Sequence, residues 1–167
     1  LEAFEHFTKL LPGAMLVLVG APHSFAWRQL TFSPLRRTMK VAGIGNQGRV
    51  LRTDHVDESF LAFLYRHCRF FVHLSSYEGF NIPVLEAAKS GAPLMLSDIP
   101  VHREIIHDAA VFVDCKDPHE TARQMKLLWN DENLRAQLGA HSQEISRQYS
   151  WKKSAVQHLD LYRSFAR

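Results

Sequence analysis

The chain has 167 residues, of which 46% are hydrophobic and 22% charged, which suits a single globular domain with a buried core. Its formal net charge is +3, and its 20 Lys and Arg residues are scattered, whereas nucleic-acid-binding proteins cluster them, so we expect no nucleic-acid partner. We find neither an apolar run of membrane-spanning length nor a signal peptide, and we therefore expect a cytoplasmic protein.

The first part of the chain shows alternating helix and strand signals. Residues 1–11 are predicted to form a helix, and the apolar run 14–19 a strand that is buried on both faces. Ser33 and Pro34 supply an N-cap and a first-turn proline for a helix over residues 33–42. A glycine-rich turn then leads to a short strand at residues 49–52.

The alternation continues to the end of the chain. Asp57 is predicted to cap a helix through residue 67, whose buried face comprises Phe60, Leu61, Leu64 and Tyr65. Further strands are expected at residues 69–74, 93–97 and 110–113, and further helices up to Gly91 and at 101–107, 117–130, 133–148 and 150–167. This order predicts an α/β fold, a doubly wound parallel sheet of five or six strands with helices on both faces.

The cysteines and histidines give no sign of a metal site. Cys68 and Cys115 lack metal-binding spacing and a catalytic partner, so both are interpreted as reduced packing residues. The 10 histidines are dispersed, and none forms a metal-binding pair beside a glutamate. We therefore expect neither a metal nor another cofactor.

The most informative segment, EGFNIPVLE, runs from Glu78 to Glu86. It follows the predicted strand 69–74, at the carboxyl edge of the sheet, where ligands bind in this fold class. Gly79, Asn81 and Pro83 are typical of a helix start, whose free N–H groups and partial positive charge attract phosphate. The carboxylates of Glu78 and Glu86 would repel phosphate but accept hydrogen bonds from hydroxyls. We expect Glu86 in the opening turn of the helix that follows Glu78. The pattern indicates a ligand with both groups, such as a nucleotide sugar.

The extended segment YEGFNIPVLEA, residues 77–87, resembles the Glu-x7-Glu signature of family 4 retaining glycosyltransferases, which have the GT-B fold. Other segments resemble the same family in the same order, namely residues 17–20, 97–100 with Glu104, 108–110, and 149–151 with Tyr162. The resemblance implies that residues 1–167 are a single nucleotide-sugar-binding domain, the C-terminal half of a two-domain enzyme. The first strand of that half and the N-terminal acceptor domain would precede this chain, and the helix 150–167 would pack toward the acceptor domain.

The resemblance also implies a role for each residue of the segment. Glu78 would bind hydroxyls of the donor sugar, and Glu86 would bind the ribose hydroxyls. The backbone N–H groups facing the sugar and the diphosphate would be those of Gly79, Phe80 and Asn81, and those facing the phosphates would be Val84 and Leu85. The nucleobase would lie near the loop at His55 and Val56.

Two departures from the family pattern stand out. The Arg and Lys that clamp the diphosphate in the family would precede this chain. Asn81 stands where the family more usually has Gly, but Asn tolerates a left-handed backbone and can cap a helix, so the turn is expected to survive. In addition, Asp54 replaces a common Gly before the base-contacting loop.

Several neighbouring residues are interpreted as structural. Asp98 and Glu104 are expected to cap or fix loops, Arg103 to be a solvated helix residue, and His73 to be packed or hydrogen-bonded. The tryptophans are expected in the core or at a domain contact. On the last helix an apolar stripe is formed by Trp151, Ala155, Leu159 and Tyr162.

The implied activity is retaining transfer of a hexose from a GDP- or UDP-sugar to a glycan or lipid-linked acceptor in polysaccharide biosynthesis, without a metal. The implied partners are the nucleotide-sugar donor and the acceptor domain, and the charge is compatible with peripheral association at the inner face of the cell membrane. The isolated chain is expected to be inactive. Two alternatives stay open, a stand-alone nucleotide-binding or regulatory module and a nucleotide-sugar epimerase on a similar scaffold.

Overall fold

The structure, a computed structural model, describes residues 1–20, 50–53 and 56–165. The predicted helix 33–42 and the glycine-rich turn after it lie outside the described residues, as do Trp27, Asp54 and His55.

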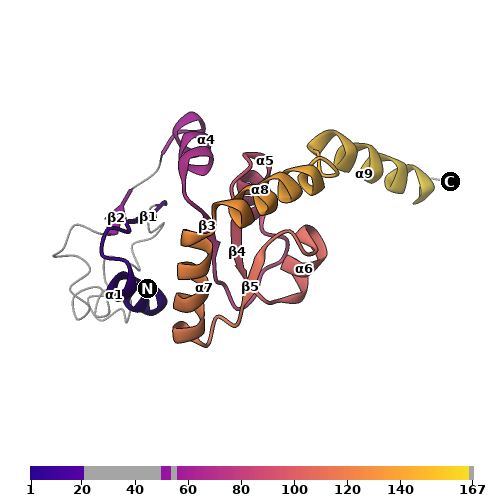
Figure 1. Ribbon diagram of the computed structural model, residues 1–167. Coiled ribbons are helices and arrows are strands. Elements are labelled where there is room, and N and C mark those ends of the chain that lie inside the picture. Colours follow the sequence, from indigo (N-terminus) through magenta and orange to yellow (C-terminus); the bar gives the residue numbers. More distant parts are fainter. Residues whose placement is uncertain (21–49, 54–55, 166–167) are drawn as a thin grey trace, which may run out of the picture.

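The described elements alternate between helices and strands as the sequence predicts (Figure 1). The helices are α1 (Glu2–Leu10), α4 (Glu58–His67), α5 (Ile82–Lys89), α6 (Pro100–Ile106), α7 (Pro118–Asn130), α8 (Glu132–Ser146) and α9 (Trp151–Phe165). The strands are β1 (Leu16–Leu18), β2 (Val50–Arg52), β3 (Phe71–His73), β4 (Leu94–Ser97) and β5 (Val111–Val113). Their bounds differ from the predicted ones by a few residues.

All strand pairs in the described part of the chain are parallel. They form a two-stranded sheet, β1–β2, and a three-stranded sheet in the order β3–β4–β5. The expected single sheet is therefore divided here, because no hydrogen-bonded ladder among the described strands joins β1 or β2 to β3. One hydrophobic cluster nevertheless spans both sheets, since Leu16 and Val50 pack against the same buried group as Met95 and Val113.

Helices cover both faces of the three-stranded sheet, which confirms the predicted layers. Strand β4 is buried along its whole length, and its side chains alternate between two hydrophobic clusters. Leu94 and Leu96 pack against residues of α5, α6 and α8. Met95 points to the other side and packs against residues of α1 and α7. This alternation places the core on both sides of β4.

Capping side chains fix where the helices begin. Asp57 accepts a hydrogen bond from Phe60 N at 2.8 Å, which confirms the predicted cap of α4. The same arrangement begins α7 at Asp117, α8 at Asp131 and α9 at Ser150. The end of α5 is marked by Gly91, which adopts a φ of +78°, the left-handed conformation that ends many helices.

The predicted buried face of α4 is wrong for Phe60. Its side chain is 44% exposed and stacks on Phe63 with the ring centroids 6.0 Å apart, and α4 has no fully buried residue. The helical period explains the difference, because Phe60, Phe63 and His67 follow one side of the helix. Leu61, Leu64 and Tyr65 follow the other side, where Tyr65 packs on the core. The outer side thus carries an exposed aromatic row.

The expectation that the strand at 14–19 is buried on both faces is also wrong. The residues of β1 are half-buried, and Met15 and Val19 beside it are 59% and 42% exposed. Leu16 packs on the core cluster, whereas Met15, Val17 and Val19 alternate to the opposite face. Only one face of β1 therefore contributes to the core of the described residues.

Helix α9 projects away from the body of the domain (Figure 1). It has no buried residue, and Trp151, Tyr162 and Phe165 are 79%, 65% and 80% exposed. The predicted apolar stripe is therefore present and uncovered, while its packing toward an acceptor domain stays a prediction. Within the described ranges no helix is both long and apolar enough to cross a membrane.

Candidate functional site

The predicted site lies at the carboxyl ends of β3 and β4. Strand β3 ends at His73 and is followed by the loop that carries Glu78 and leads to α5. Strand β4 ends at Ser97, directly before α6. Because β3 and β4 are parallel neighbours, their carboxyl ends meet at one edge of the sheet. The expected position of the Glu78 loop at that edge is confirmed.

Glu78 is held by the last residue of β3. His73 Nε2 lies 2.9 Å from Glu78 Oε1, and the two side chains are 26% and 29% exposed. The hydrogen bond from His73 holds the pKa of Glu78 below its ordinary value, so this carboxylate is ionised at neutral pH. An ionised carboxylate only accepts hydrogen bonds, which assigns the proton of this contact to His73 Nε2. The expectation that His73 is hydrogen-bonded is confirmed.

Asn81 occupies the N-cap position of α5 in a left-handed conformation, with φ 70° and ψ 68°. The turn that the sequence predicts therefore survives the replacement of Gly by Asn. The Asn81 side chain makes no cap hydrogen bond to the backbone of α5. Its amide Nδ2 instead lies 2.9 Å from His102 Nε2, and both residues are buried. A buried side-chain contact thus fixes the residue from which α5 begins.

His102 is fully buried at the start of α6, and its two ring nitrogens have different partners. Nδ1 lies 2.9 Å from the carbonyl oxygen of Ser97, which can only accept a hydrogen bond, so Nδ1 carries the proton. Nε2 is then free to accept from the Asn81 amide. Burial lowers the pKa of His102, which agrees with this neutral ring.

Two serines connect the Glu78 loop to β4. The Ser97 hydroxyl donates to the Ser75 carbonyl oxygen at 2.6 Å, which links the end of β4 to the loop after β3. The Ser75 hydroxyl is itself buried and has no hydrogen-bond partner in the described part of the chain. The rings of His73 and His102 lie edge to face with their centroids 5.9 Å apart. The supports of Glu78 and of Asn81 are therefore neighbours.

Gly79 and Phe80 lie on the exposed side of the same turn. A Cβ atom added at Gly79 would meet nothing within 4 Å, so open space faces this residue. Phe80 is 45% exposed and packs edge to face against Tyr149, with the ring centroids 5.8 Å apart. The turn thus leaves room for a ligand beside its backbone.

The first turn of α5 offers fewer free N–H groups than the sequence predicts. Pro83 has none, and Val84 N donates to Asn81 O at 3.2 Å. The Val84 side chain is fully buried, and Leu85 packs at the margin of the same core. The phosphate-facing roles of Val84 and Leu85 stay predictions.

Glu86 is not in the opening turn of α5. The helix begins at Ile82, so Glu86 lies in the second turn, where its side chain is exposed. The turn around Asn81 starts the helix earlier in the sequence than the motif suggests. The Tyr65 hydroxyl makes a long contact of 3.5 Å with Glu86 Oε2, and burial raises the pKa of Tyr65 to about 12, so Tyr65 stays protonated. Of the predicted base loop, Val56 is half-buried and His55 lies outside the described residues.

Asp98 and Arg103 pair beside the site. Arg103 donates to both carboxylate oxygens of Asp98 at 2.8 and 2.9 Å, and its guanidinium lies 3.8 Å from the ring centroid of Phe112. The Arg103 side chain is half-exposed, and its contacts with Asp98 and Phe112 hold it in place. The structural interpretation of Asp98 fits this pairing, because the carboxylate is occupied by Arg103.

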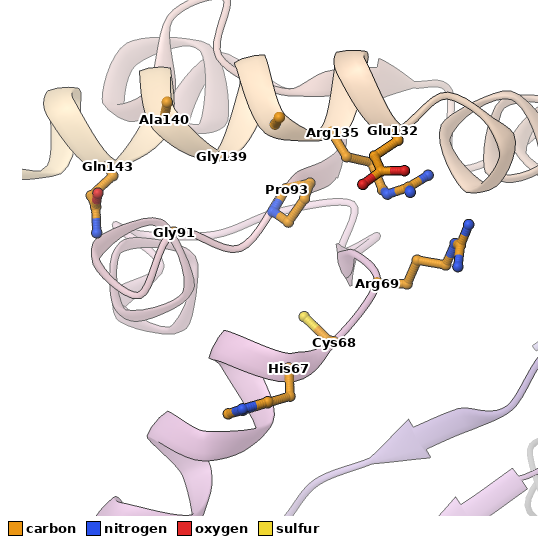
Figure 2. A pocket seen from close by; sticks show the side chains of 11 residues that line it. His67, Cys68, Arg69, Gly91, Pro93, Glu132, Arg135, Gly139, Ala140 and Gln143 are labelled. Atoms are coloured by element: carbon orange, nitrogen blue, oxygen red, sulfur yellow. The ribbon is translucent and has the colours of Figure 1, made fainter.

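A cavity of about 600 Å³ opens at the opposite edge of the sheet (Figure 2). Figure 2 shows Cys68 and Arg69 on one side and Arg135 and Gly139 of α8 on the other. Arg69 and Arg135 both donate to the Trp129 carbonyl oxygen, so they stabilise the end of α7. This cavity contains none of the predicted site residues. In the described ranges, no group of His, Cys, Asp and Glu could hold a metal ion.

The sequence pattern of the family described as "Glycosyl transferases group 1" matches residues 1–145, which include the whole candidate site. Among curated proteins, the chain is 28% identical over 117 residues to "O-antigen chain mannosyltransferase B" of Escherichia coli, covering 70% of the chain and 31% of that protein. It is 31% identical over 120 residues to the "D-inositol 3-phosphate glycosyltransferase" of Xylanimonas cellulosilytica, covering 71% of the chain and 29% of that protein. The chain thus spans about a third of these relatives.

Solved structures share the fold. Sucrose-phosphate synthase from Thermosynechococcus elongatus superposes with a TM-score of 0.80 at 22% identity, covering 98% of this chain and 41% of that one. The Anabaena protein Alr3699/HepE, in complex with UDP and glucose, gives a TM-score of 0.80 at 18% identity, covering 98% and 44%. The α/β fold and the family resemblance predicted from the sequence are confirmed, and the chain belongs to the group 1 glycosyltransferase family.

Proposed function

We propose that this chain is the donor-binding half of a retaining glycosyltransferase that transfers a hexose from a GDP- or UDP-sugar to a glycan or lipid-linked acceptor. The observation that carries the proposal is the ionised Glu78, held by His73 beside the start of α5. A carboxylate accepts strong hydrogen bonds from sugar hydroxyls, and a helix start favours phosphate. The two halves of a nucleotide sugar match these neighbouring features.

The proposed chemistry needs no protein base on this half. Cleavage of the bond between the sugar and the diphosphate leaves negative charge on the departing phosphate and positive charge on the sugar ring. The dipole at the start of α5 stabilises the negative charge on the phosphate, and the Glu78 carboxylate stabilises the positive charge on the sugar ring. Glu86, in the second turn of α5, has an exposed carboxylate that suits the ribose hydroxyls.

The names of matched proteins and the exposed stripe on α9 support the proposed sugar and the proposed acceptor domain. Two matched proteins of Escherichia coli are named as mannosyltransferases, which favours mannose as the hexose and polysaccharide synthesis as the process. The exposed apolar stripe on α9 suits packing toward an acceptor domain of the same protein, in keeping with the shorter length of the chain. We propose that the full-length enzyme acts in the cytoplasm, at the inner face of the cell membrane, if its acceptor is lipid-linked.

Calorimetry with GDP, UDP, GDP-mannose and UDP-glucose tests the proposal. We expect the chain to bind one nucleoside diphosphate, and Glu86→Ala to weaken that binding about 10-fold or more, because a hydrogen bond to a charged group is lost. Glu144→Ala is the matched control, since Glu144 is an exposed residue of α8 paired with Arg147. Absence of nucleotide binding by the wild type, or equal binding after Glu86→Ala, would contradict the assignment. Release of an epimer from the donor alone would support an epimerase instead.

A further inference from the structure

We propose that His73 is a positioning residue that sets the affinity of the site for the sugar part of the donor. This proposal rests on the function proposed above. His73 Nε2–H donates a hydrogen bond to Glu78 Oε1. Besides His73, the Ser75 hydroxyl lies close enough to lower the pKa of the same carboxylate. The 2.9 Å hydrogen bond from His73 is the contact that fixes the position of Oε1.

The His73 ring is well placed to act as an anchor. It belongs to the last residue of β3, whose backbone is set by its register opposite Leu96 of the central strand. On the same face of the strand the ring stacks with Phe71, with centroids 6.1 Å apart, and it meets the buried His102 ring edge to face. Because the strand and both rings restrict His73, its Nε2–H points in a defined direction.

Glu78 needs such an anchor because it lies in a loop. A glutamate side chain has several freely rotating bonds, and fixing it when a ligand binds reduces the affinity of that ligand. The hydrogen bond from His73 fixes the carboxylate before the ligand arrives. It also keeps Glu78 ionised, so that it acts as an acceptor for hydroxyl groups. Removing the Nε2–H donor should therefore weaken the sugar contact.

The effect should be confined to the sugar part of the donor. The start of α5 is supported by a different contact, from Asn81 to His102. His73 makes no hydrogen bond to α5 among the described residues, where its side-chain partner is Glu78. A nucleoside diphosphate without the sugar would thus bind independently of His73.

The test compares His73→Phe, which keeps a ring but removes the donor, with His73→Gln, which keeps an N–H donor. We expect His73→Phe to weaken binding of GDP-mannose or UDP-glucose about 3- to 10-fold while GDP and UDP bind as to the wild type. His73→Gln should retain most of the sugar-dependent affinity. The surface substitution His158→Phe on α9 is the matched control. Equal weakening of nucleotide and nucleotide sugar, or no effect of His73→Phe, would overturn the proposal.

A second measurement needs no ligand. In nitrogen-15 NMR spectra of the imidazole groups, neutral His73 should be the Nε2–H tautomer, and Glu78→Gln should shift its Nε2 resonance. An unchanged His73 ring in Glu78→Gln would overturn the positioning role. If the wild type binds neither nucleotide nor nucleotide sugar while the NMR shift is seen, the function proposed above fails and the anchoring of Glu78 by His73 stands.

Discussion

Replacing Asn81 probes the contact that begins α5. Asn81→Ala removes the amide that bonds His102 Nε2 and leaves this buried nitrogen without a donor, which costs about 1–3 kcal/mol. Alanine keeps a Cβ atom at a φ of 70°, as Asn81 does, so the strain of the left-handed backbone is common to both residues and adds little to the difference. We therefore expect Asn81→Ala to lower the free energy of unfolding by about 1–3 kcal/mol. Such a loss is a large share of the stability of a small domain.

Asn81→Gly separates the two contributions. Glycine accepts the left-handed conformation but lacks the amide, so the free energy of unfolding of Asn81→Gly should be higher than that of Asn81→Ala by about 1 kcal/mol. Combined with His102→Leu, Asn81→Gly should cost less than it does alone, because the hydrogen bond is already absent. These differences distinguish the effect of the backbone from that of the buried contact.

Urea denaturation followed by circular dichroism measures these free energies. Asn133→Ala is the control, since Asn133 is an exposed residue near the start of α8 and its loss should change the free energy of unfolding by less than about 0.5 kcal/mol. Equal destabilisation by Ala and Gly at position 81 would refute the left-handed strain. A cost of both variants no larger than that of the control would refute the contribution of the amide–imidazole contact.

Three further outcomes are expected. Gly139→Ala should lower the free energy of unfolding by about 1–3 kcal/mol in urea denaturation, because the new Cβ would approach the Gly91 carbonyl oxygen to 2.5 Å. Burial raises the pKa of Cys68 to about 11, so mass spectrometry at pH 8 should show its alkylation slowed on the order of 100-fold relative to the unfolded chain. The pKa of Glu78 is lowered on folding, so its stabilising contribution is complete above its ordinary pKa and is lost as the pH falls through the folded value. The difference in urea midpoint between the wild type and Glu78→Gln should therefore shrink as the pH is lowered from 6 to 3.

Local signals in the sequence predicted much of the fold. Asp57 and Ser150 were identifiable as caps because a short polar side chain before an apolar period has one favoured role there. Gly91 marked the end of α5 for an equally local reason. The Glu78 loop was placed at the carboxyl edge of the sheet because it directly follows an apolar strand.

Features that depend on distant partners were missed or misplaced. The sequence does not show that His102 is buried, because its partners are Asn81 and the Ser97 carbonyl oxygen, and the first is 21 residues away. The sequence favours a core position for Phe60 because its neighbours share its apolar character, and only the packing of α4 decides which side faces inward. The sequence pattern predicts Glu86 one turn too early, because the left-handed turn at Asn81 sets the start of α5.

The identity of residue 81 follows from these distant contacts. A glycine would satisfy the left-handed backbone alone, but Asn also supplies the amide that bonds His102. His102 in turn bonds the Ser97 carbonyl oxygen, so the start of α5 is tied to the end of β4. Glu78 depends instead on His73 at the end of β3. Because His73 supports Glu78 and His102 supports Asn81, substitutions at His73 should act mainly on the sugar contact and those at Asn81 mainly on the phosphate contact, with a coupling between them through the contact of the His73 and His102 rings.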